Sequence, residues 1–497
     1  MKNPVRTFWG VFALWLATFV LPARAQSPRL DPSFILTSAT GRPPNFAFGI
    51  RDMVLQPDGK LVVAGEFRSI NGRPLVNLAR LLPDGQVDTT FAALQVDDYI
   101  TTITLQADGK LLIGGYFTTV GGQSRIGIAR LLSNGSLDPG FLSPLGRSPS
   151  FGGYAYSNVE KIVLQPGRGI LVLGSMMPIN PTPFSGFSAA RLLEATGALD
   201  PAFQLGSYLY TCNDVLVQPS GHLVFAGSPR LFNGQPCYVW GALPDGALDP
   251  AFVPLPGPNT FSRAYRITRD PATGKLYAVI ATASGLGLRF EPVRLLPNGA
   301  PDPSFSVAGV FPPVTVGGVN SLAVQPNGRL LLGGGFPTPG GGFFGSCRLL
   351  PSGALDPSYQ PANGPRAFVQ KVLVQPNGAL LFAGGFQEVV GLPVSCLARM
   401  LDANVLSARA PAAADEEDEL VAWPVPAREV LRLRLPAGRP ARQAALLDAL
   451  GRVVRQQTLL ASQSAPVLPT AGLPPGGYLL RVTFASGPPV YRRVVVE

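Results

Sequence analysis

Histidine is almost absent from the 497-residue sequence, and only 14% of the residues are charged. The single histidine, His222, rules out Ser-His-Asp catalysis and zinc sites built on several histidines for the bulk of the chain. Lysine and arginine form no stripe interleaved with aromatic residues, so the composition argues against nucleic-acid binding. His222 itself follows a glycine turn and is expected at the surface of a hairpin.

Cysteine is also scarce, with four residues whose spacing matches no metal-binding motif. Cys212 is expected at the start of a first strand and Cys237 at the start of a third one, with another strand between them. That separation is about 10 Å, which is too far for a disulfide bond. Cys347 and Cys396 fall on corresponding strands of neighbouring repeats. We therefore expect four free thiols, although the export route inferred below permits disulfides.

Long hydrophobic runs are missing except near the N-terminus. There, an apolar run of about 14 residues from Phe8 to Leu21 follows two basic residues and precedes an Ala-x-Ala site at Ala23. The run is shorter than the roughly 20 residues that a membrane anchor needs. Residues 1–25 are therefore predicted to be a cleaved signal peptide, which implies a secreted or cell-surface protein. No later stretch is apolar enough to span a bilayer.

Turn residues are abundant: the sequence contains 57 glycines and 52 prolines, and no helical period persists beyond one turn. A turn of the Gln-Pro-x-Gly type recurs about every 50 residues. Each repeat splits into four short runs bounded by turn residues, which is typical of strands and hairpins. Seven such copies predict an all-β chain with a seven-bladed β-propeller within residues 26–409. The seven turns begin at Gln56, Gln106, Gln165, Gln218, Arg269, Gln325 and Gln375.

The second hairpin of each repeat can be registered from the sequence alone. With residues 83–85 as its loop, Leu81 faces Val87 and Arg80 faces Asp88. An exposed cross-strand pair of opposite charges contributes about 0.2–1 kcal/mol. Because the pair recurs at equivalent places, we interpret it as structural rather than catalytic. The pairs are Arg80 with Asp88, Arg130 with Asp138, Arg191 with Asp200, Arg294 with Asp302 and Arg348 with Asp356.

The two ends of the repeat array complement each other. The last repeat ends at Asp402 without the Leu-Asp-Pro-x-Phe segment of the other repeats, whereas residues 30–34 carry such a segment alone. We predict that residues 30–34 supply the outer strand of the last blade and close the ring. A closed ring leaves no free blade edge on which other chains can pair.

The array from residue 30 to residue 402 resembles the delta-60 family of β-propeller repeats. The resemblance rests on the Gln-Pro-Asp-Gly-Lys-Leu and Asp-x-x-Phe signatures. Two copies depart from the pattern, because the fifth carries Arg269 in place of the turn glutamine and the fourth carries Gly241 in place of the arginine. The family implies a propeller found in large secreted or surface bacterial proteins, and it implies no settled activity.

The first strand of each blade is expected to line the central channel. After alignment on the turn residues, two successive positions are mostly polar and differ between blades, which makes the channel mouth a candidate ligand site. Glu160, Asn213, Asp214 and Asn320 offer oxygen ligands for a divalent cation, and such a site would resemble lactonase-type propellers. The alternative is an ordinary solvated rim. The two positions hold Arg51, Thr101, Glu160, Asn213, Ala264, Asn320 and Gln370, followed by Asp52, Thr102, Lys161, Asp214, Tyr265, Ser321 and Lys371.

The C-terminal part of the chain has a different composition. Residues 410–419 end in five consecutive acidic residues and are predicted to be a flexible linker. Residues 420–497 contain alternating apolar and polar segments and are predicted to form a small β-sandwich. Three segments that begin at Trp423, Leu446 and Gly476 resemble, in order, the type A C-terminal sorting domain of the type IX secretion system in Bacteroidota. The resemblance implies that the secretion machinery is a partner; a carbohydrate-binding or adhesive sandwich is the alternative.

The repeats carry packing chemistry rather than catalytic chemistry. We therefore expect an exported, non-enzymatic, monomeric propeller that acts as a binding or adhesion scaffold at the cell surface, with a glycan or a protein as its ligand. The alternative is a metal-dependent hydrolase or lactonase whose site at the channel mouth contains Glu160, Asn213, Asp214 and Asn320.

Overall fold

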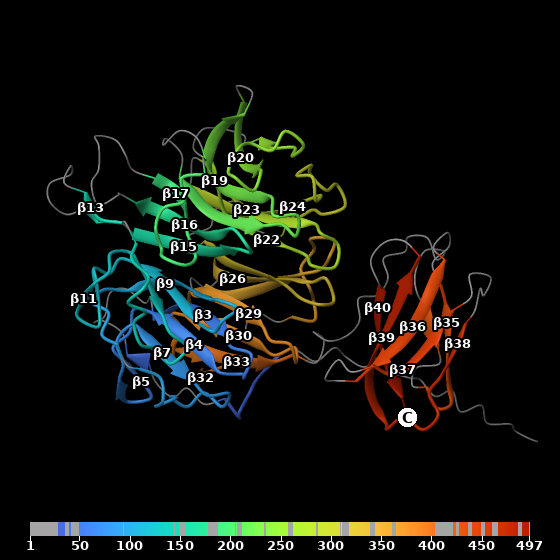
Figure 1. Ribbon diagram of the computed structural model, residues 1–497. Coiled ribbons are helices and arrows are strands. Elements are labelled where there is room, and N and C mark those ends of the chain that lie inside the picture. Colours follow the sequence, from blue (N-terminus) through green and yellow to red (C-terminus); the bar gives the residue numbers. More distant parts are fainter. Residues whose placement is uncertain are drawn as a thin grey trace, which may run out of the picture. The chain divides into compact units, whose positions relative to one another are not determined.

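Strands and turns make up the residues that the computed structural model describes, and no helix that could cross a membrane occurs among them (Figure 1). The chain divides into two units, Met1–Arg409 and Ala410–Glu497. The predicted signal peptide and the predicted linker 410–419 lie outside the described residues. The described residues are 28–34, 39–40, 49–92, 94–143, 145–148, 155–156, 158–176, 187–203, 205, 211–232, 235–256, 262–284, 287–308, 310, 318–337, 343–359, 364–402, 421–423, 427–435, 440–448, 453–459, 466–485 and 490–496.

The first repeat shows how its sequence produces a sheet. Strand β3 (Ile50–Leu55) ends at a turn whose Gly59 has a φ of 83°, a conformation that residues with side chains rarely adopt. Strand β4 (Leu61–Gly65) follows the turn and is buried along its whole length. Its alternate side chains enter two different cores, because Leu61 and Val63 pack toward the last repeat whereas Val62 and Ala64 pack toward the second. Each face of this sheet is therefore covered by another sheet.

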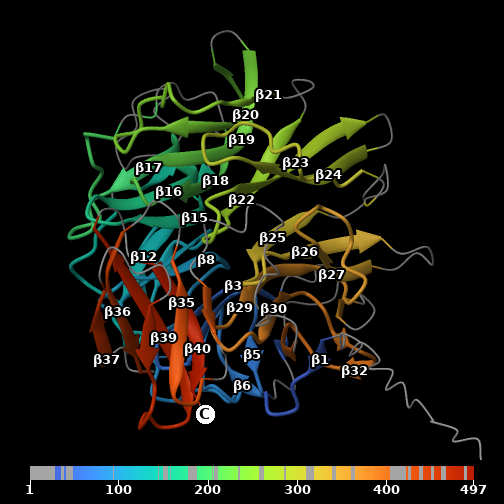
Figure 2. The ribbon, with the colours of Figure 1, turned by 90° about the vertical axis from the view of Figure 1, so that its right-hand side faces the viewer.

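Three consecutive antiparallel strands recur in this way along the first unit, and seven such sets lie within its described residues. The sheets follow one another in the colour order of Figures 1 and 2, and the last set lies beside the first, with which it shares a core. The sets are β3, β4 and β7 (Leu78–Leu81); β8 (Ile100–Leu105), β9 (Leu111–Gly115) and β12 (Ile128–Leu131); β15 (Asn158–Gln165), β16 (Gly169–Met176) and β17 (Phe187–Leu192); β18 (Cys212–Val217), β19 (Leu223–Phe232) and β20 (Gln235–Ala242); β22 (Arg263–Arg269), β23 (Leu276–Ser284) and β24 (Gly287–Leu295); β25 (Val319–Val324), β26 (Leu330–Pro337) and β27 (Phe343–Leu349); β29 (Val369–Val374), β30 (Leu380–Gly384) and β33 (Leu397–Leu401).

Short strands distinguish some repeats from others. Repeats one, two and seven insert an extra hairpin between their second and third strands, whereas repeats three to six have longer second strands instead. The short strands are β2 (Ala39–Thr40), which pairs with β5 (Ser69–Ile70) and through it with β6 (Arg73–Pro74); β10 (Thr119–Val120) with β11 (Gln123–Ser124); β13 (Arg147–Ser148) with β14 (Ala155–Tyr156); β21 (Leu255–Pro256) on β20; and β28 (Pro365–Arg366), which joins β27 to β31 (Glu388–Val389) and β32 (Leu392–Pro393).

The expected fourth strand of each repeat is much shorter than the sequence pattern indicates. In the first repeat it is a single bridge between Leu81 and Val87, and the backbone N–H of Asp88 donates to the carbonyl of Arg80 at 2.8 Å. This is the predicted register. The strand ends there because the Asp88 carboxylate accepts the backbone N–H of Thr90 at 2.9 Å, which turns the chain.

The arginine of each recurring Arg–Asp pair is buried and also reaches the next repeat. Arg80 Nε donates to Asp88 Oδ2 at 2.8 Å, and Arg80 Nη1 donates to the carbonyl of Ser133 in the loop of the second repeat at 2.8 Å. The guanidinium carbon lies 4.7 Å from the centre of the Phe91 ring. The sequence pattern suggested an exposed pair, but only 8% of Arg80 and 5% of Asp88 are exposed, because the neighbouring loop and the aromatic ring cover them.

The same link to the next repeat occurs in most of the array. Six arginines share it, and the guanidinium carbon of each lies 4.6 to 5.0 Å from the centre of an aromatic ring. The acceptor is a backbone carbonyl in four further cases and a carboxylate in one: the carbonyls of Glu194 for Arg130, Pro244 for Arg191, Pro351 for Arg294 and Pro83 for Arg399, and the carboxylate of Asp402 for Arg348.

The fourth repeat replaces this arrangement. A Cβ atom on Gly241 would lie 2.4 Å from Cβ of Phe252, so the phenylalanine fills the space that an arginine side chain takes in the other repeats. The partner of Asp249 is His222, whose Nδ1 lies 2.8 Å from Asp249 Oδ2. The backbone N–H of Val253 still donates to the carbonyl of Asn298 in repeat five at 2.7 Å.

The orphan segment near the N-terminus pairs with the last repeat. Strand β1 (Arg29–Leu30) runs antiparallel to β33, with Leu30 opposite Met400. Asp31 Oδ2 accepts Arg399 Nε at 2.7 Å, as the aspartates of the other repeats do. Phe34 belongs to the core that the first and last repeats share.

All four cysteines are buried, and none of them is in a disulfide bond. Cys212 begins β18, and Cys237 lies in β20 on the other side of β19, which keeps the two thiols apart as expected. Burial raises the pKa of the Cys396 thiol to about 11 and that of the Cys347 thiol further, so both stay protonated at neutral pH.

The second unit consists of two sheets that share one core. In β39 (Gly476–Phe484) alternate residues such as Leu480 and Val482 are buried, whereas Leu479 is exposed, which is the period of two that the sequence predicts. Leu431 of the other sheet enters the same core. One sheet has the order β34 (Val421–Trp423), β35 (Val430–Arg434) and β38 (Val467–Pro469); the other has the order β37 (Val453–Thr458), β36 (Ala441–Leu447), β39 and β40 (Val490–Val496).

The burial of Arg348 gives a prediction about stability. Replacing it in Arg348→Met removes the guanidinium that both Asp356 and Asp402 bind in the core, although Asp356 keeps Arg329 at 3.3 Å. We expect a loss of about 3–5 kcal/mol of unfolding free energy, measured by urea denaturation. The control is Arg366→Met, whose partner Glu388 lies 3.4 Å away on the surface and whose loss should cost less than about 1 kcal/mol. Equal losses in the two variants would contradict the assignment.

Candidate functional site

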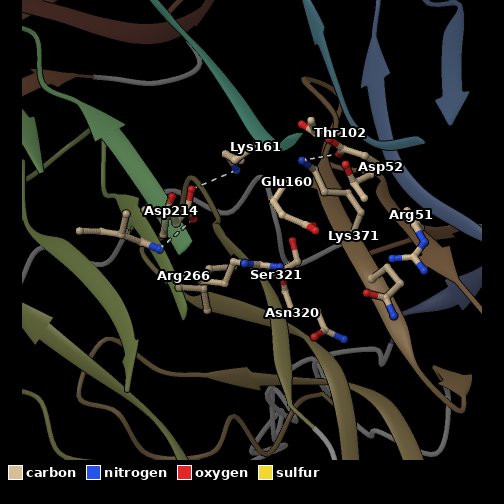
Figure 3. Close-up of a pocket in the computed structure, with 15 residues that line it drawn as sticks. Arg51, Asp52, Thr102, Glu160, Lys161, Asp214, Arg266, Asn320, Ser321 and Lys371 are labelled. Atoms are coloured by element: carbon tan, nitrogen blue, oxygen red, sulfur yellow. Dashed lines mark hydrogen bonds and ion pairs between the residues drawn. The ribbon is translucent and has the colours of Figure 1, made fainter. Parts of the chain in front are cut away.

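A polar cavity of about 260 Å³ lies among the first strands of the seven repeats (Figure 3). Each of these strands has a β-bulge, and the lining side chains come mainly from the bulged residue and the one after it. The lining residues are Arg51, Asp52, Thr101, Thr102, Glu160, Lys161, Asp214, Arg266, Ile267, Thr268, Asn320, Ser321, Leu322, Gln370 and Lys371.

The fifth repeat corrects the sequence alignment by one residue. The bulge lies between Ala264 and Arg266, so Tyr265 is the bulged residue and Arg266, which lines the cavity, follows it, whereas the sequence alignment assigned these two positions to Ala264 and Tyr265. Asp270 takes the place of the turn glutamine, since its backbone N–H donates to the carbonyl of Lys275 at 2.8 Å. The extra residue therefore lies in the turn. The Asp-Pro dipeptide at position 270, which matches Gln-Pro elsewhere, was the signal in the sequence.

Asp52 joins three neighbouring repeats. Its carboxylate accepts the backbone N–H of Met53 at 2.9 Å in its own strand, the backbone N–H of Ile103 in repeat two at 3.0 Å, and the Lys371 ammonium of repeat seven at 2.7 Å. Burial alone would raise the pKa of Asp52, but the Lys371 charge and these hydrogen bonds outweigh it and hold the pKa below its usual value. Asp52 is therefore ionised at neutral pH.

Asp214 repeats the arrangement on the far side of the cavity. It accepts the backbone N–H of Val215 at 3.0 Å, that of Ile267 in repeat five at 3.1 Å, and the Lys161 ammonium of repeat three at 3.2 Å. Ser321 links repeats six and seven by one such bond, because its hydroxyl oxygen accepts the backbone N–H of Val372 at 3.1 Å. These side chains satisfy backbone groups at the junctions between repeats.

The asparagines predicted as ligands also form links between repeats. Asn213 Nδ2 donates to the carbonyl of Ala264 at 2.7 Å, and Asn320 Nδ2 donates to the carbonyl of Val369 at 3.1 Å. Asn320 lines the cavity, whereas Asn213 is not among the lining residues.

Glu160 has different surroundings, at the rim. Its Oε1 accepts the hydroxyl of Tyr116 at 2.6 Å and Nδ2 of Asn158 at 3.1 Å. Burial, together with this carboxylate, raises the pKa of the Tyr116 hydroxyl well above its usual value. The Tyr116 and Tyr99 rings are 4.6 Å apart, and Arg51 lies 4.4 Å from the centre of the Tyr99 ring. Neither tyrosine was predicted from the sequence, because neither lies at an aligned lining position.

The four predicted residues do not converge on one point. Asp214 binds Lys161, Glu160 binds Tyr116, and the asparagines donate to backbone carbonyls. Across the part of the chain that the structure describes, no three His, Cys, Asp or Glu side chains gather where they could hold a metal ion.

Comparison with known proteins bears on the repeats. Residues 56–91 and 106–141 match the model of a family described as a domain of unknown function (DUF5122) β-propeller. The repeated sheets are those of a β-propeller. The matched segments lie in the first and second repeats. Each begins at the turn glutamine and ends at the phenylalanine that follows the second hairpin. No curated protein matches the chain.

Several solved structures are similar at low identity. An extracellular domain assigned to a hybrid two component system of B. thetaiotaomicron is 10% identical, with a TM-score of 0.27, and the match covers 90% of this chain and 69% of that one. A GH74 xyloglucanase from Xanthomonas campestris is 13% identical, with a TM-score of 0.37 and coverages of 87% and 71%. A protein of unknown function from Dyadobacter fermentans is 14% identical, with a TM-score of 0.31 and coverages of 75% and 100%. At these values nothing about activity is transferred to this chain.

Proposed function

We propose that this protein is an exported binding scaffold, a closed seven-bladed β-propeller that holds a polar ligand at the mouth of its channel. The observation that carries the proposal is the cavity of about 260 Å³, whose polar side chains differ from one first strand to the next. The outer parts of the repeats, by contrast, use nearly identical Arg–Asp links. Uniform links between the repeats, combined with side chains that vary at the channel mouth, are expected when the channel mouth supplies the function.

Closure of the ring is supported by the contacts of the N-terminal segment. Strand β1 completes the sheet of the last repeat, and Arg399 of that repeat donates to Pro83 in the loop of the first repeat. Phe34 packs on Arg399 at 4.6 Å as Phe91 packs on Arg80 at 4.7 Å. The segment thus supplies the parts that every other blade supplies for itself.

Phe34→Ala and Phe91→Ala test closure as a matched pair, because both phenylalanines are 8% exposed and belong to equivalent cores. In a closed ring both variants should lose about 3–5 kcal/mol of unfolding free energy, measured by urea denaturation. An unchanged stability in Phe34→Ala beside a clear loss in Phe91→Ala would mean that the N-terminal segment is not part of the ring.

Export is assigned to the two ends of the chain. Residues 1–25 have the layout of a signal peptide, and the second unit carries the three ordered segments that resemble a type A sorting domain. Its two sheets with a shared core are what a small β-sandwich requires. The type IX secretion machinery is the proposed partner, and the cell surface or the medium is the proposed location.

Removing residues 420–497 should trap the propeller in the periplasm, because the truncated chain keeps its signal peptide and loses the sorting domain. Fractionation and immunoblotting of the propeller measure this in a Bacteroidota host with a functional type IX system. A full-length chain carrying Arg366→Met, a surface change, should be secreted normally. Equal amounts of truncated and full-length protein in the medium would contradict the assignment of residues 420–497 as a sorting domain.

Binding at the mouth is tested by thermal unfolding of the purified protein with neutral and acidic sugars, Ca²⁺, Mg²⁺ and Zn²⁺. We expect a sugar to raise the unfolding temperature and Glu160→Ala to abolish the shift, because Glu160 lines the cavity. Glu388→Ala, on the surface strand β31, is the control and should retain the shift. A stoichiometric metal ion that is lost in Glu160→Ala would favour the metal-dependent hydrolase instead.

A further inference from the structure

The hydrogen-bonding capacity of the cavity wall is unevenly distributed between donors and acceptors. Asp52 and Asp214 each accept three donors, two from backbone amides and one from a lysine. An ionised carboxylate has about four acceptor positions, so both aspartates are nearly saturated. They hold the repeats together and have little capacity left for a ligand.

The lysines that bind these aspartates keep most of their donors. An ammonium group has three N–H donors. Within the described part of the chain, Lys161 directs one donor to Asp214 and Lys371 directs one to Asp52. Both side chains line the cavity and are about one-third exposed (Figure 3). Their remaining N–H groups are available to a molecule inside it.

Two further groups add to this surplus of donors. Arg266 uses Nε on the carbonyl of Asn320 at 2.6 Å and Nη1 on that of Tyr265 at 2.9 Å, which fixes the guanidinium and leaves Nη2 for the cavity. Ser321 accepts a backbone N–H through its oxygen and so keeps its hydroxyl hydrogen. The lining holds four cationic side chains and three anionic ones: Arg51, Lys161, Arg266 and Lys371 against Asp52, Glu160 and Asp214.

The rim offers an apolar contact beside these donors. The rings of Tyr99 and Tyr116 are paired at 4.6 Å, and both adjoin lining residues, since Tyr116 binds Glu160 and Tyr99 lies under Arg51. Tyrosine rings provide apolar faces with a polar edge. Glu160 itself is exposed and offers one carboxylate to hydroxyl donors of a ligand.

We propose that the channel mouth binds a sugar acid: a monosaccharide-sized group with one carboxylate among the lysines and Arg266, its ring against the tyrosines, and a hydroxyl on Glu160. The carboxylate is matched to the unused donors of Lys161, Lys371 and Arg266, because Arg51 already pairs with Glu66 at 3.8 Å. The cavity of about 260 Å³ lies below the roughly 300–1,000 Å³ of drug-sized sites, which restricts the bound part to a small group. The inference rests on the proposed function, because it names the ligand chemistry of the same site.

The test compares D-glucuronate, D-glucose and acetate by isothermal titration of the full-length mature protein. Glucuronate should bind at least about tenfold more tightly than glucose or acetate, and its affinity should fall as NaCl rises. Lys161→Gln and Lys371→Gln should each weaken glucuronate binding at least about tenfold. The matched control is Lys110→Gln, because Lys110 is as exposed as Lys161 and pairs with Asp138 at 3.4 Å outside the cavity. This control should change the affinity less than about twofold.

Some outcomes of this experiment would contradict the sugar acid and still leave a binding site at the channel mouth. Glucose binding as tightly as glucuronate, and weakened by Lys161→Gln, would overturn the sugar acid and leave a binding site at the mouth. Acetate binding as tightly as glucuronate would overturn the sugar and leave an anion site. No binding of any probe, or binding unaffected by Lys161→Gln and Lys371→Gln, would overturn the sugar acid. The thermal unfolding screen with Glu160→Ala tests the proposed function separately. The comparisons on the wild-type protein decide the matter if the lysine variants fail to fold.

Discussion

A buried arginine at the junction between neighbouring repeats is the interaction on which the first unit depends. Its side chain meets three partners at once: an aspartate in its own hairpin, an acceptor in the loop of the next repeat, and an aromatic ring beneath its plane. Burying a guanidinium is favourable only when its donors are satisfied in this way. A lysine could not replace it, because a single ammonium group has neither the fork of donors nor the flat face.

The fourth repeat shows how the frame tolerates the loss of that arginine. Phe252 fills the vacated space over Gly241, so the packing is kept, and His222 is the partner of Asp249. What is lost is the arginine's link to the loop of repeat five, whereas the backbone bond from Val253 to Asn298 and the side-chain bonds of Asp214 and Asn213 to repeat five remain. At the arginine position, therefore, apolar packing of Phe252 replaces the charged link that the neighbouring junctions have.

Local patterns in the sequence were sufficient for the repeat, its hairpin register and the pairs such as Arg80 with Asp88. They were insufficient for burial, because a charged pair on a hairpin reads as exposed unless the loop of the next repeat is known to cover it. They also misplaced the fifth repeat, where an extra turn residue shifted the lining position from Tyr265 to Arg266. Tyr99 and Tyr116 could not be found from the aligned positions, since they approach the cavity only through contacts between strands.

Variation among repeats does not by itself identify ligand-binding residues at the channel mouth. Part of that variation is structural, because first strands that meet at a junction leave backbone amides and carbonyls to be satisfied. Asp52 satisfies two such amides and Asn213 one carbonyl, so their side chains are fixed by the frame. The distinguishing property is unused hydrogen-bonding capacity in a residue that lines the cavity. By that criterion the acids and amides that looked most like ligands in the sequence belong mainly to the frame. In the proposed site, the lysines that neutralise the acids are the groups that supply donors to the ligand.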